Sequence, residues 1–201
     1  MRLLAQITAG CCFLSALVLV AGGSLTAGEK GKSVKVGDKA PTFESVSDDG
    51  KAWKSADHVG KKIVVVYFYP ADFTGGCTKQ ACGFRDNMSS LASKSVEVVG
   101  VSGDSVKTHQ MFKAHEKLNF ALLADEKGEL AKAFGVPVGK GGQSPTIDET
   151  GAKGTAPRGV TIQRWTVVID KGGNVAALYQ VADAGGDAKK IADIVEKLET
   201  K

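Results

Sequence analysis

The chain has 201 residues, of which 43% are apolar and 24% are charged, and its formal net charge is +4. This length suits one domain with a sizeable core. Its basic residues are mixed with acidic ones and form no run interleaved with aromatic residues, which argues against nucleic acid as a partner.

The N-terminal segment differs in composition from the rest. Arg2 supplies one early positive charge, residues 11–21 read CCFLSALVLVA, and small residues follow before Glu29. This order is typical of a secretory signal peptide, with cleavage after Ala27 or near residues 22–23. The charge-free stretch 3–28 is also long enough for an uncleaved membrane anchor. We therefore expect a signal peptide or anchor in 1–27, a linker in 28–33 and a folded domain in 34–201, exported to the periplasm or anchored facing it.

The first half of the domain alternates strand and helix patterns. FESVSDDGKAW (43–53) indicates a hairpin with its turn at 48–50, and KKIVVVYFYP (61–70) indicates a buried central strand. A helix is expected from Thr78, then a strand within 96–104 and a helix within 105–118. We interpret His109 as an exposed and His115 as a partly buried residue of that second helix.

The second half continues the alternation. Residues 120–136 predict a short strand, a turn and a helix, 164–180 a β-hairpin, and 186–201 an amphipathic helix. Residues 135–160 are rich in Gly, Pro, Thr and Ser, so we expect a long loop or extension there. The order of elements predicts an α/β domain with a mixed sheet.

Two cysteines follow the buried strand. Cys11 and Cys12 lie in the leader, so the mature protein would hold only Cys77 and Cys82. A thiolate at Cys77 would be favoured by the start of a helix, and Pro70 and Thr74 would stiffen the preceding loop and offer a hydroxyl. Cys82 lies five residues on. On one helix the two Cα atoms would be roughly 8.6 Å apart, beyond the limit of about 7 Å for a disulfide without backbone movement.

The residue pattern alone leaves several readings of this pair open. A structural zinc site needs four ligands, and the three histidines show no matching spacing. A C-x-x-C motif is absent. Reactive thiols and inert buried thiols remain as alternatives at this point.

The stretch YFYPADFTGGCTKQACGFRD (67–86) resembles the active-site segment of the peroxiredoxins, specifically the subfamily called PrxQ or bacterioferritin comigratory protein. Pro70, Thr74 and Cys77 meet its Pro-x-x-x-Thr-x-x-Cys signature, and Cys82 matches the resolving cysteine typical of that subfamily. The resemblance covers roughly residues 34–198. It implies a thioredoxin-like fold of the peroxiredoxin type, with a mixed central sheet flanked by helices.

The resemblance also implies roles for individual residues. Cys77 would be the peroxidatic cysteine and Cys82 the resolving one, Thr74 would hold the peroxide, and Pro70 would shield the sulfur. The arginine that accompanies this cysteine in the family maps onto Arg164 in RWTVVID. Its positive charge would stabilise both the thiolate and the charge developing on the peroxide.

The implied activity is thiol-dependent reduction of hydrogen peroxide and organic hydroperoxides. A sulfenic acid at Cys77 would be resolved by a disulfide with Cys82, and thioredoxin or a periplasmic thioredoxin-like protein would reduce it. This chemistry requires no metal, haem or flavin, and a local resolving cysteine favours a monomer. Arg158 is a substitute candidate for Arg164. The alternative function is a redox-sensing or binding module of the same fold, without efficient turnover.

Overall fold

The computed structural model describes residues 33–200. The expected signal peptide or anchor (1–27) and nearly all of the expected linker (28–33) lie outside the described residues. Within 33–200, no helix is both long enough and apolar enough to cross a membrane.

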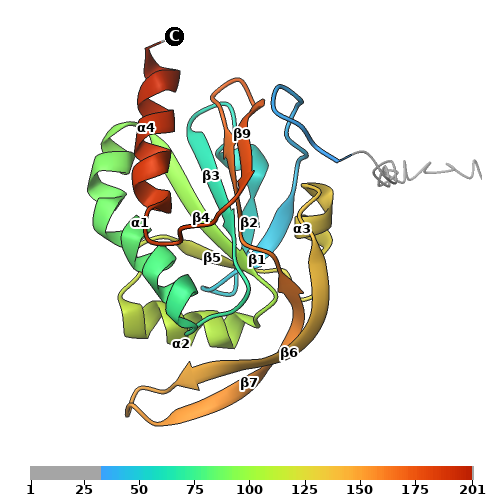
Figure 1. Cartoon of the computed structure of the whole chain (residues 1–201), viewed down its shortest axis with the longest axis vertical. Helices are drawn as coiled ribbons and strands as arrows, with labels where there is room; N and C mark the ends of the chain where they lie inside the picture. The colour runs from blue at the N-terminus through green and yellow to red at the C-terminus, as the bar shows by residue number, and fades with distance from the viewer. Residues whose placement is uncertain (1–32, 201) are drawn as a thin grey trace, which may run out of the picture. The chain divides into compact units, whose positions relative to one another are not determined.

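A mixed seven-stranded sheet forms the centre of the domain (Figure 1), in the order β2-β1-β5-β4-β3-β8-β9. β3 runs parallel to β4 and antiparallel to β8, and β4 runs parallel to β5. The strands are β1 (Glu44–Ser47), β2 (Ala52–Lys54), β3 (Ile63–Phe68), β4 (Val96–Ser102), β5 (Ala121–Ala124), β8 (Trp165–Ile169) and β9 (Val175–Gln180).

The apolar run of β3 explains its interior position. All six residues are buried, and alternate side chains enter the two apolar clusters on the opposite faces of the sheet. Full burial of each Ile, Val or Phe side chain of this run stabilises the fold by about 1.5–3 kcal/mol. The run therefore supplies both cores, as expected of a strand covered on both sides.

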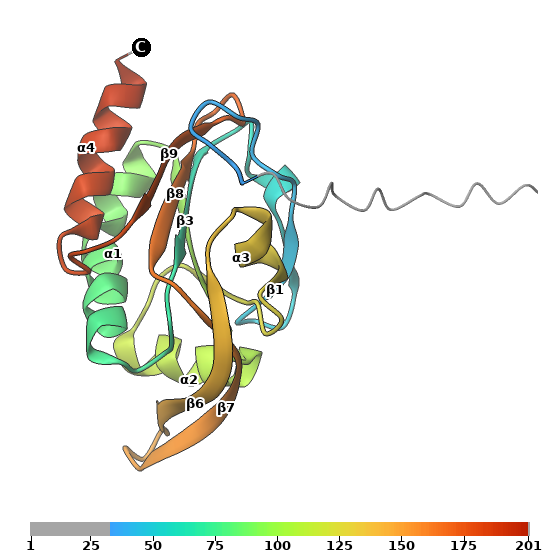
Figure 2. The same cartoon turned by 45° about the vertical axis from the view of Figure 1, so that its right-hand side comes forward.

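Helices cover both faces of the sheet (Figure 2). Helices α1 (Gly75–Ser93) and α4 (Asp187–Glu199) pack against one face through Phe84, Leu91 and Ile191, among others. The short helix α3 (Glu129–Ala133) packs on the other face with Phe43 and Trp53. Helix α2 (Val106–Glu116) buries Phe112 in the first cluster, and a 3-10 turn, η1 (Ser55–Asp57), follows β2.

Of the two alternatives for residues 135–160, a long loop or an extension, the loop was wrong and the segment forms an extension. This segment is a two-stranded antiparallel ribbon of β6 (Val138–Ile147) and β7 (Lys153–Ile162), which projects beyond the sheet in Figure 1. At its base, Gly159 donates its backbone N–H to the carbonyl of Gly103 (3.0 Å). A Cβ at Gly159 would collide with the carbonyl of Glu126, and one at Gly103 with the carbonyl of Val160. Glycine composition here therefore reflects close backbone packing.

The other predicted elements are confirmed, with one shifted boundary. The hairpin at 43–53, the strand and helix at 120–136, the hairpin at 164–180 and the C-terminal helix all form. Helix α1 begins at Gly75 instead of Thr78, because the two glycines after Thr74 already adopt helical geometry. The earlier start places Cys77 inside the first turn of the helix.

Candidate active site

Cys77 lies at the buried start of α1. The side chain is 1% exposed, and Thr74 is the N-cap residue with an extended backbone (φ −84°, ψ 143°). In the first backbone hydrogen bond of the helix, the N–H of Thr78 donates to the carbonyl of Thr74 (2.8 Å). The N–H groups of residues 75–77 therefore have no acceptor within the helix, and they create a partial positive charge beside the thiol.

Arg164 reaches the sulfur of Cys77 from the segment just before β8. It immediately precedes β8, and the pairing of Phe68 with Trp165 brings it to the end of β3. Its Nη2 lies 3.1 Å from the Cys77 Sγ. A side chain at Gly76 would crowd this guanidinium, since a Cβ there would lie 3.2 Å from Nη2. The positive charge of Arg164 is thus directed at the Cys77 sulfur.

A chain of hydrogen bonds that ends at the buried Asp187 orients Arg164. Its Nη1 donates to Gln80 Oε1 (2.6 Å), and Gln80 Nε2 donates to Asp187 Oδ2 (2.8 Å). Asp187, at the start of α4, also accepts hydrogen bonds from Thr166 (2.7 Å) and Tyr179 (2.8 Å). Sequence reasoning gave no role to Gln80 or Asp187. The spacing of Gln80 from Cys77, about one helical turn, was a local signal for it.

Arg158, the substitute candidate, lies elsewhere. It is on β7 and donates to Ser144 Oγ (2.8 Å), Thr161 Oγ1 (2.8 Å) and the Val160 carbonyl (3.1 Å). Its guanidinium is therefore occupied within the ribbon, while Arg164 contacts the cysteine.

Pro70 and Thr74 lie in the loop between β3 and α1. Both are half-buried, and the Thr74 hydroxyl donates to the Ala71 carbonyl (3.0 Å). The lone pairs of that oxygen remain able to accept a further hydrogen bond. Between them Phe73 has a left-handed backbone (φ 56°), and its ring packs on Phe112 at 5.1 Å between centroids. The structure thus brings Pro70, Thr74, Cys77 and Arg164 together at one end of the sheet.

Cys82 lies further along α1 and faces the end of α2. Both cysteines are free thiols, and the Sγ of Cys82 donates to the Glu116 carboxylate (3.6 Å). Burial raises the pKa of the Cys82 thiol, and Glu116 raises it further while Arg85 opposes the shift. Arg85 also joins the two helices by donating to the Glu116 carbonyl (2.6 Å). Cys82 is therefore held as a protonated thiol, pointing at a different partner from Cys77.

The interpretation of the two α2 histidines was reversed. His109 is completely buried against residues 69–74, the loop between β3 and α1 that we call the active-site loop, whereas the His115 side chain is 42% exposed. The buried position follows from the contact of α2 with that loop, where His109 pairs with Asp72. Apolar periodicity alone does not reveal a polar partner on another segment.

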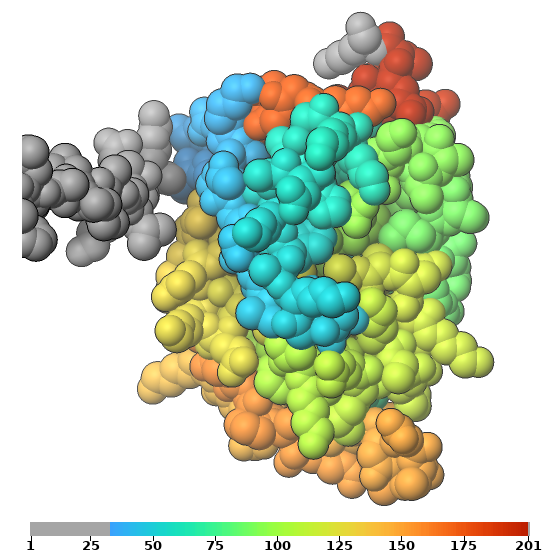
Figure 3. Space-filling model, turned by 180° about the vertical axis from the view of Figure 1, so that it is seen from behind, coloured from blue at the N-terminus to red at the C-terminus, as the bar shows by residue number. Residues whose placement is uncertain are grey.

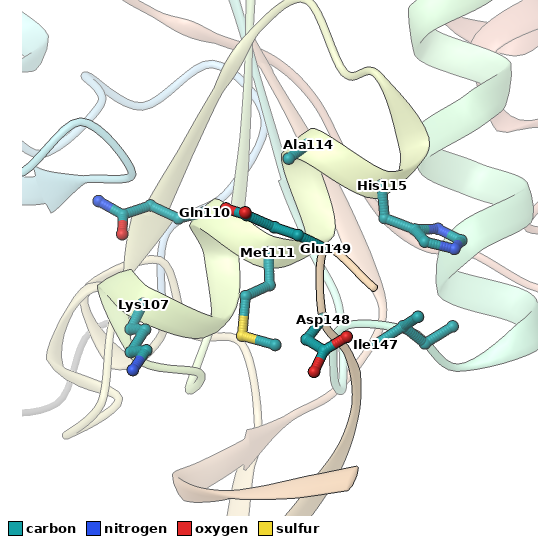
Figure 4. A pocket seen from close by; sticks show the side chains of 8 residues that line it. All are labelled: Lys107, Gln110, Met111, Ala114, His115, Ile147, Asp148 and Glu149. Carbon is teal, nitrogen blue, oxygen red and sulfur yellow. The ribbon is translucent and has the colours of Figure 1, made fainter. Parts of the chain in front are cut away.

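A groove between α2 and the end of the ribbon is a separate feature (Figure 4). Met111 and His115 from α2 and Ile147 and Asp148 from the ribbon line it. The space-filling view shows α2 and the ribbon adjoining at this end of the molecule (Figure 3). The residues that line this groove include neither Cys77, Cys82 nor Arg164.

Comparison with known proteins identifies the class of this chain. Residues 36–183 match the model of the AhpC/TSA family. A Coxiella burnetii protein named as a Bcp peroxiredoxin is 40% identical over 166 residues, which are 83% of this chain and 99% of that protein. Chloroplastic peroxiredoxin Q of Oryza sativa subsp. japonica is 40% identical over 146 residues, 73% of this chain and 59% of that protein.

Solved structures agree on the fold. The peroxidoxin BcpB of Mycobacterium tuberculosis has a TM-score of 0.68 at 28% identity and covers 82% of this chain and 98% of its own. PrxQ of Xylella fastidiosa has a TM-score of 0.69 at 22% identity, and the match covers 85% of this chain and all of that chain. At this identity the match supports the fold only. The expected thioredoxin-like peroxiredoxin fold is confirmed.

The chain belongs to the AhpC/TSA family. Within that family its relatives are peroxiredoxins of the Bcp/PrxQ type, and the protein is a thiol-dependent peroxidase.

Proposed function

We propose that Cys77 is the peroxidatic cysteine of this enzyme and that Arg164 activates it. The observation that carries the proposal is the 3.1 Å contact between the guanidinium and the Cys77 sulfur at a helix start. The thiolate attacks the terminal oxygen of R–O–O–H, a sulfur–oxygen bond forms and the oxygen–oxygen bond breaks. Cys77 becomes a sulfenic acid, and the leaving oxygen takes up a proton to give water or an alcohol.

The loop residues support the same step. The Thr74 hydroxyl already donates to the Ala71 carbonyl, so its oxygen is oriented to accept the peroxide O–H. The unpaired N–H groups of residues 75–77 and the Arg164 fork stabilise charge on the peroxide oxygens as their bond breaks. Pro70 restricts the loop and covers the sulfur from water.

We further propose that Cys82 resolves the sulfenic acid within the same chain. Its thiol attacks the Cys77 sulfur, a disulfide forms and water leaves. Because their Cα atoms on an intact helix are about 8.6 Å apart, the start of α1 must unwind to allow that bond, whose limit is about 7 Å. Separation from Glu116 removes one influence that keeps Cys82 protonated.

The remaining part of the proposal concerns recycling and location. A dithiol protein, thioredoxin or a periplasmic thioredoxin-like reductant, attacks the disulfide and restores both thiols by exchange. The leader-like composition of residues 1–27 supports export or anchoring that faces the periplasm. A resolving cysteine on the same helix supports a monomer as the working unit.

Intact mass spectrometry of the reduced protein, before and after one equivalent of hydrogen peroxide, tests the two cysteine roles. We expect wild type to lose two hydrogens without gaining oxygen. The Cys82→Ser variant should gain one oxygen, and the matched Cys77→Ser variant should remain unchanged. Peroxide turnover by Cys77→Ser at the wild-type rate would refute the assignment, and a disulfide-free, oxygenated wild type would remove Cys82 from its role.

A further inference from the structure

A buried network of polar side chains contacts the active-site loop. Asp72, Asp104 and His109 have no solvent exposure, yet the peroxide chemistry above uses none of them. They come from the loop after β3, the loop after β4 and the helix α2. Burying ionisable groups costs free energy unless each group has hydrogen-bond partners, so each of these three side chains requires such partners.

A short contact joins Asp72 and His109. His109 Nδ1 lies 2.8 Å from Asp72 Oδ2, and its Nε2 lies 3.2 Å from the Leu123 carbonyl. With Asp72 ionised, both partners of the ring are acceptors, so the ring donates from both nitrogens and carries a positive charge. Burial raises the pKa of Asp72, and the facing His109 counteracts that rise. The second Asp72 oxygen accepts from the Tyr69 hydroxyl (2.7 Å). Both oxygens of the carboxylate are thus satisfied.

Asp104 binds the backbone of Asp72 and extends the network to the ribbon. Asp104 Oδ2 accepts the backbone N–H of Asp72 (2.9 Å) and the Ser102 hydroxyl (2.6 Å). Its other oxygen accepts from Ser144 on β6, and Arg158 in turn donates to Ser144. The ribbon therefore contributes a direct hydrogen bond to the group that fixes the active-site loop.

The location of Asp72 explains what this support achieves. Asp72 directly precedes Phe73, whose left-handed backbone is unfavourable for a bulky residue. Such a conformation persists only where the surroundings hold it. The next residue is Thr74, the N-cap of α1, and Cys77 follows by one turn. Anchoring both the amide and the carboxylate of Asp72 therefore fixes the position of the groups that contact the peroxide.

We propose that Asp72 and His109, supported by Asp104, are positioning residues for the peroxide reaction. They hold the Thr74 hydroxyl and the first turn of α1 in the geometry that receives the substrate, and Ser144 makes the ribbon part of that support. The proposal rests on the assignment of Cys77 as the attacking residue. It concerns orientation of the peroxide, because none of these side chains contacts the Cys77 sulfur.

The test compares two reactions of the same thiol in the full-length protein. The thiol of the Cys77 peptide is followed by quenched-flow mass spectrometry during reaction with hydrogen peroxide and, separately, with iodoacetamide. Alkylation needs a thiolate but no positioned peroxide. The variants are His109→Asn and Ser144→Ala. The matched control is His58→Asn, which removes a different imidazole that stacks on Trp53 (4.4 Å between ring centroids).

For His109→Asn we expect the peroxide rate to fall by about tenfold or more, while alkylation stays equal or becomes faster because the loop is looser. Ser144→Ala should lower the peroxide rate by about threefold, and His58→Asn should leave both rates unchanged. Should His109→Asn fail to fold, Ser144→Ala carries the test alone.

Loss of thermal stability with an unchanged peroxide rate would overturn the proposal, since that result describes a purely structural network. An equal fall in both rates would also overturn it. If wild-type Cys77 itself fails to react with peroxide, both this inference and the assignment of Cys77 are overturned. If wild type reacts and the variants match it, only this inference fails.

Discussion

Replacing Arg164 with alanine removes the charge that faces the Cys77 sulfur. At 3.1 Å and an effective dielectric constant of about 20, two unit charges attract by about 5 kcal/mol. Arg164 is half-buried, so solvent reduces this value. Loss of one preorganised donor at a developing charge typically costs about 3 kcal/mol, and we therefore expect roughly a hundredfold slower reaction with peroxide.

Stopped-flow measurement of the second-order rate of Cys77 oxidation tests this value. Arg164→Lys keeps a charge but loses the planar guanidinium that bridges Cys77 and Gln80. Its oxidation rate should therefore lie between those of wild type and Arg164→Ala. Lys79→Ala is the matched control, because it removes a positive charge from an exposed site on α1, the helix that carries Cys77. Oxidation of Arg164→Ala within threefold of wild type would refute the electrostatic argument.

Three further predictions concern other parts of the molecule. Glu116→Gln should lower the pKa of the Cys82 thiol, seen as alkylation of Cys82 that begins at lower pH; an unchanged profile contradicts the assigned contact. Gly159→Ala should destabilise the protein by at least about 1–3 kcal/mol in chemical denaturation, because its Cβ meets a backbone carbonyl; full stability would exclude that packing. Burial lowers the pKa of His109, but the Asp72 carboxylate outweighs it and the net shift is upward. The resulting stability is complete below the ordinary pKa of about 6.5 and is lost as pH rises through the folded value; ¹⁵N NMR should show both ring protons at pH 7, and a neutral ring there would contradict the ion pair.

The parts of the fold that follow from local sequence could be predicted. The apolar run that forms β3 indicates a strand covered on both faces, and the signature from Pro70 to Cys82 lies within one short stretch. Arg164 was found only through resemblance to a family. Nothing in its local sequence distinguishes it from Arg158, and the pairing of β3 with β8 decides which of them reaches Cys77.

Features that depend on distant contacts could not be predicted in the same way. Residues 135–160 lack a continuous apolar pattern, and they form a ribbon through backbone pairing and close glycine contacts. The burial of His109 depends on Asp72, which is 37 residues away. Gln80 and Asp187 are 107 residues apart, so their hydrogen bond exists only after the two helices have packed.

The participation of Asp187 has a consequence for biosynthesis. Cys77 and the strand before it leave the ribosome long before α4, the last helix of residues 33–200, has been made. Until then Gln80 and Tyr179 lack their carboxylate partner, and Arg164 has no complete support for its orientation. A chain that lacks α4 would thus carry the Cys77 thiol without an oriented arginine. Orientation of Arg164 through Gln80 therefore requires that α4 has been made and has packed.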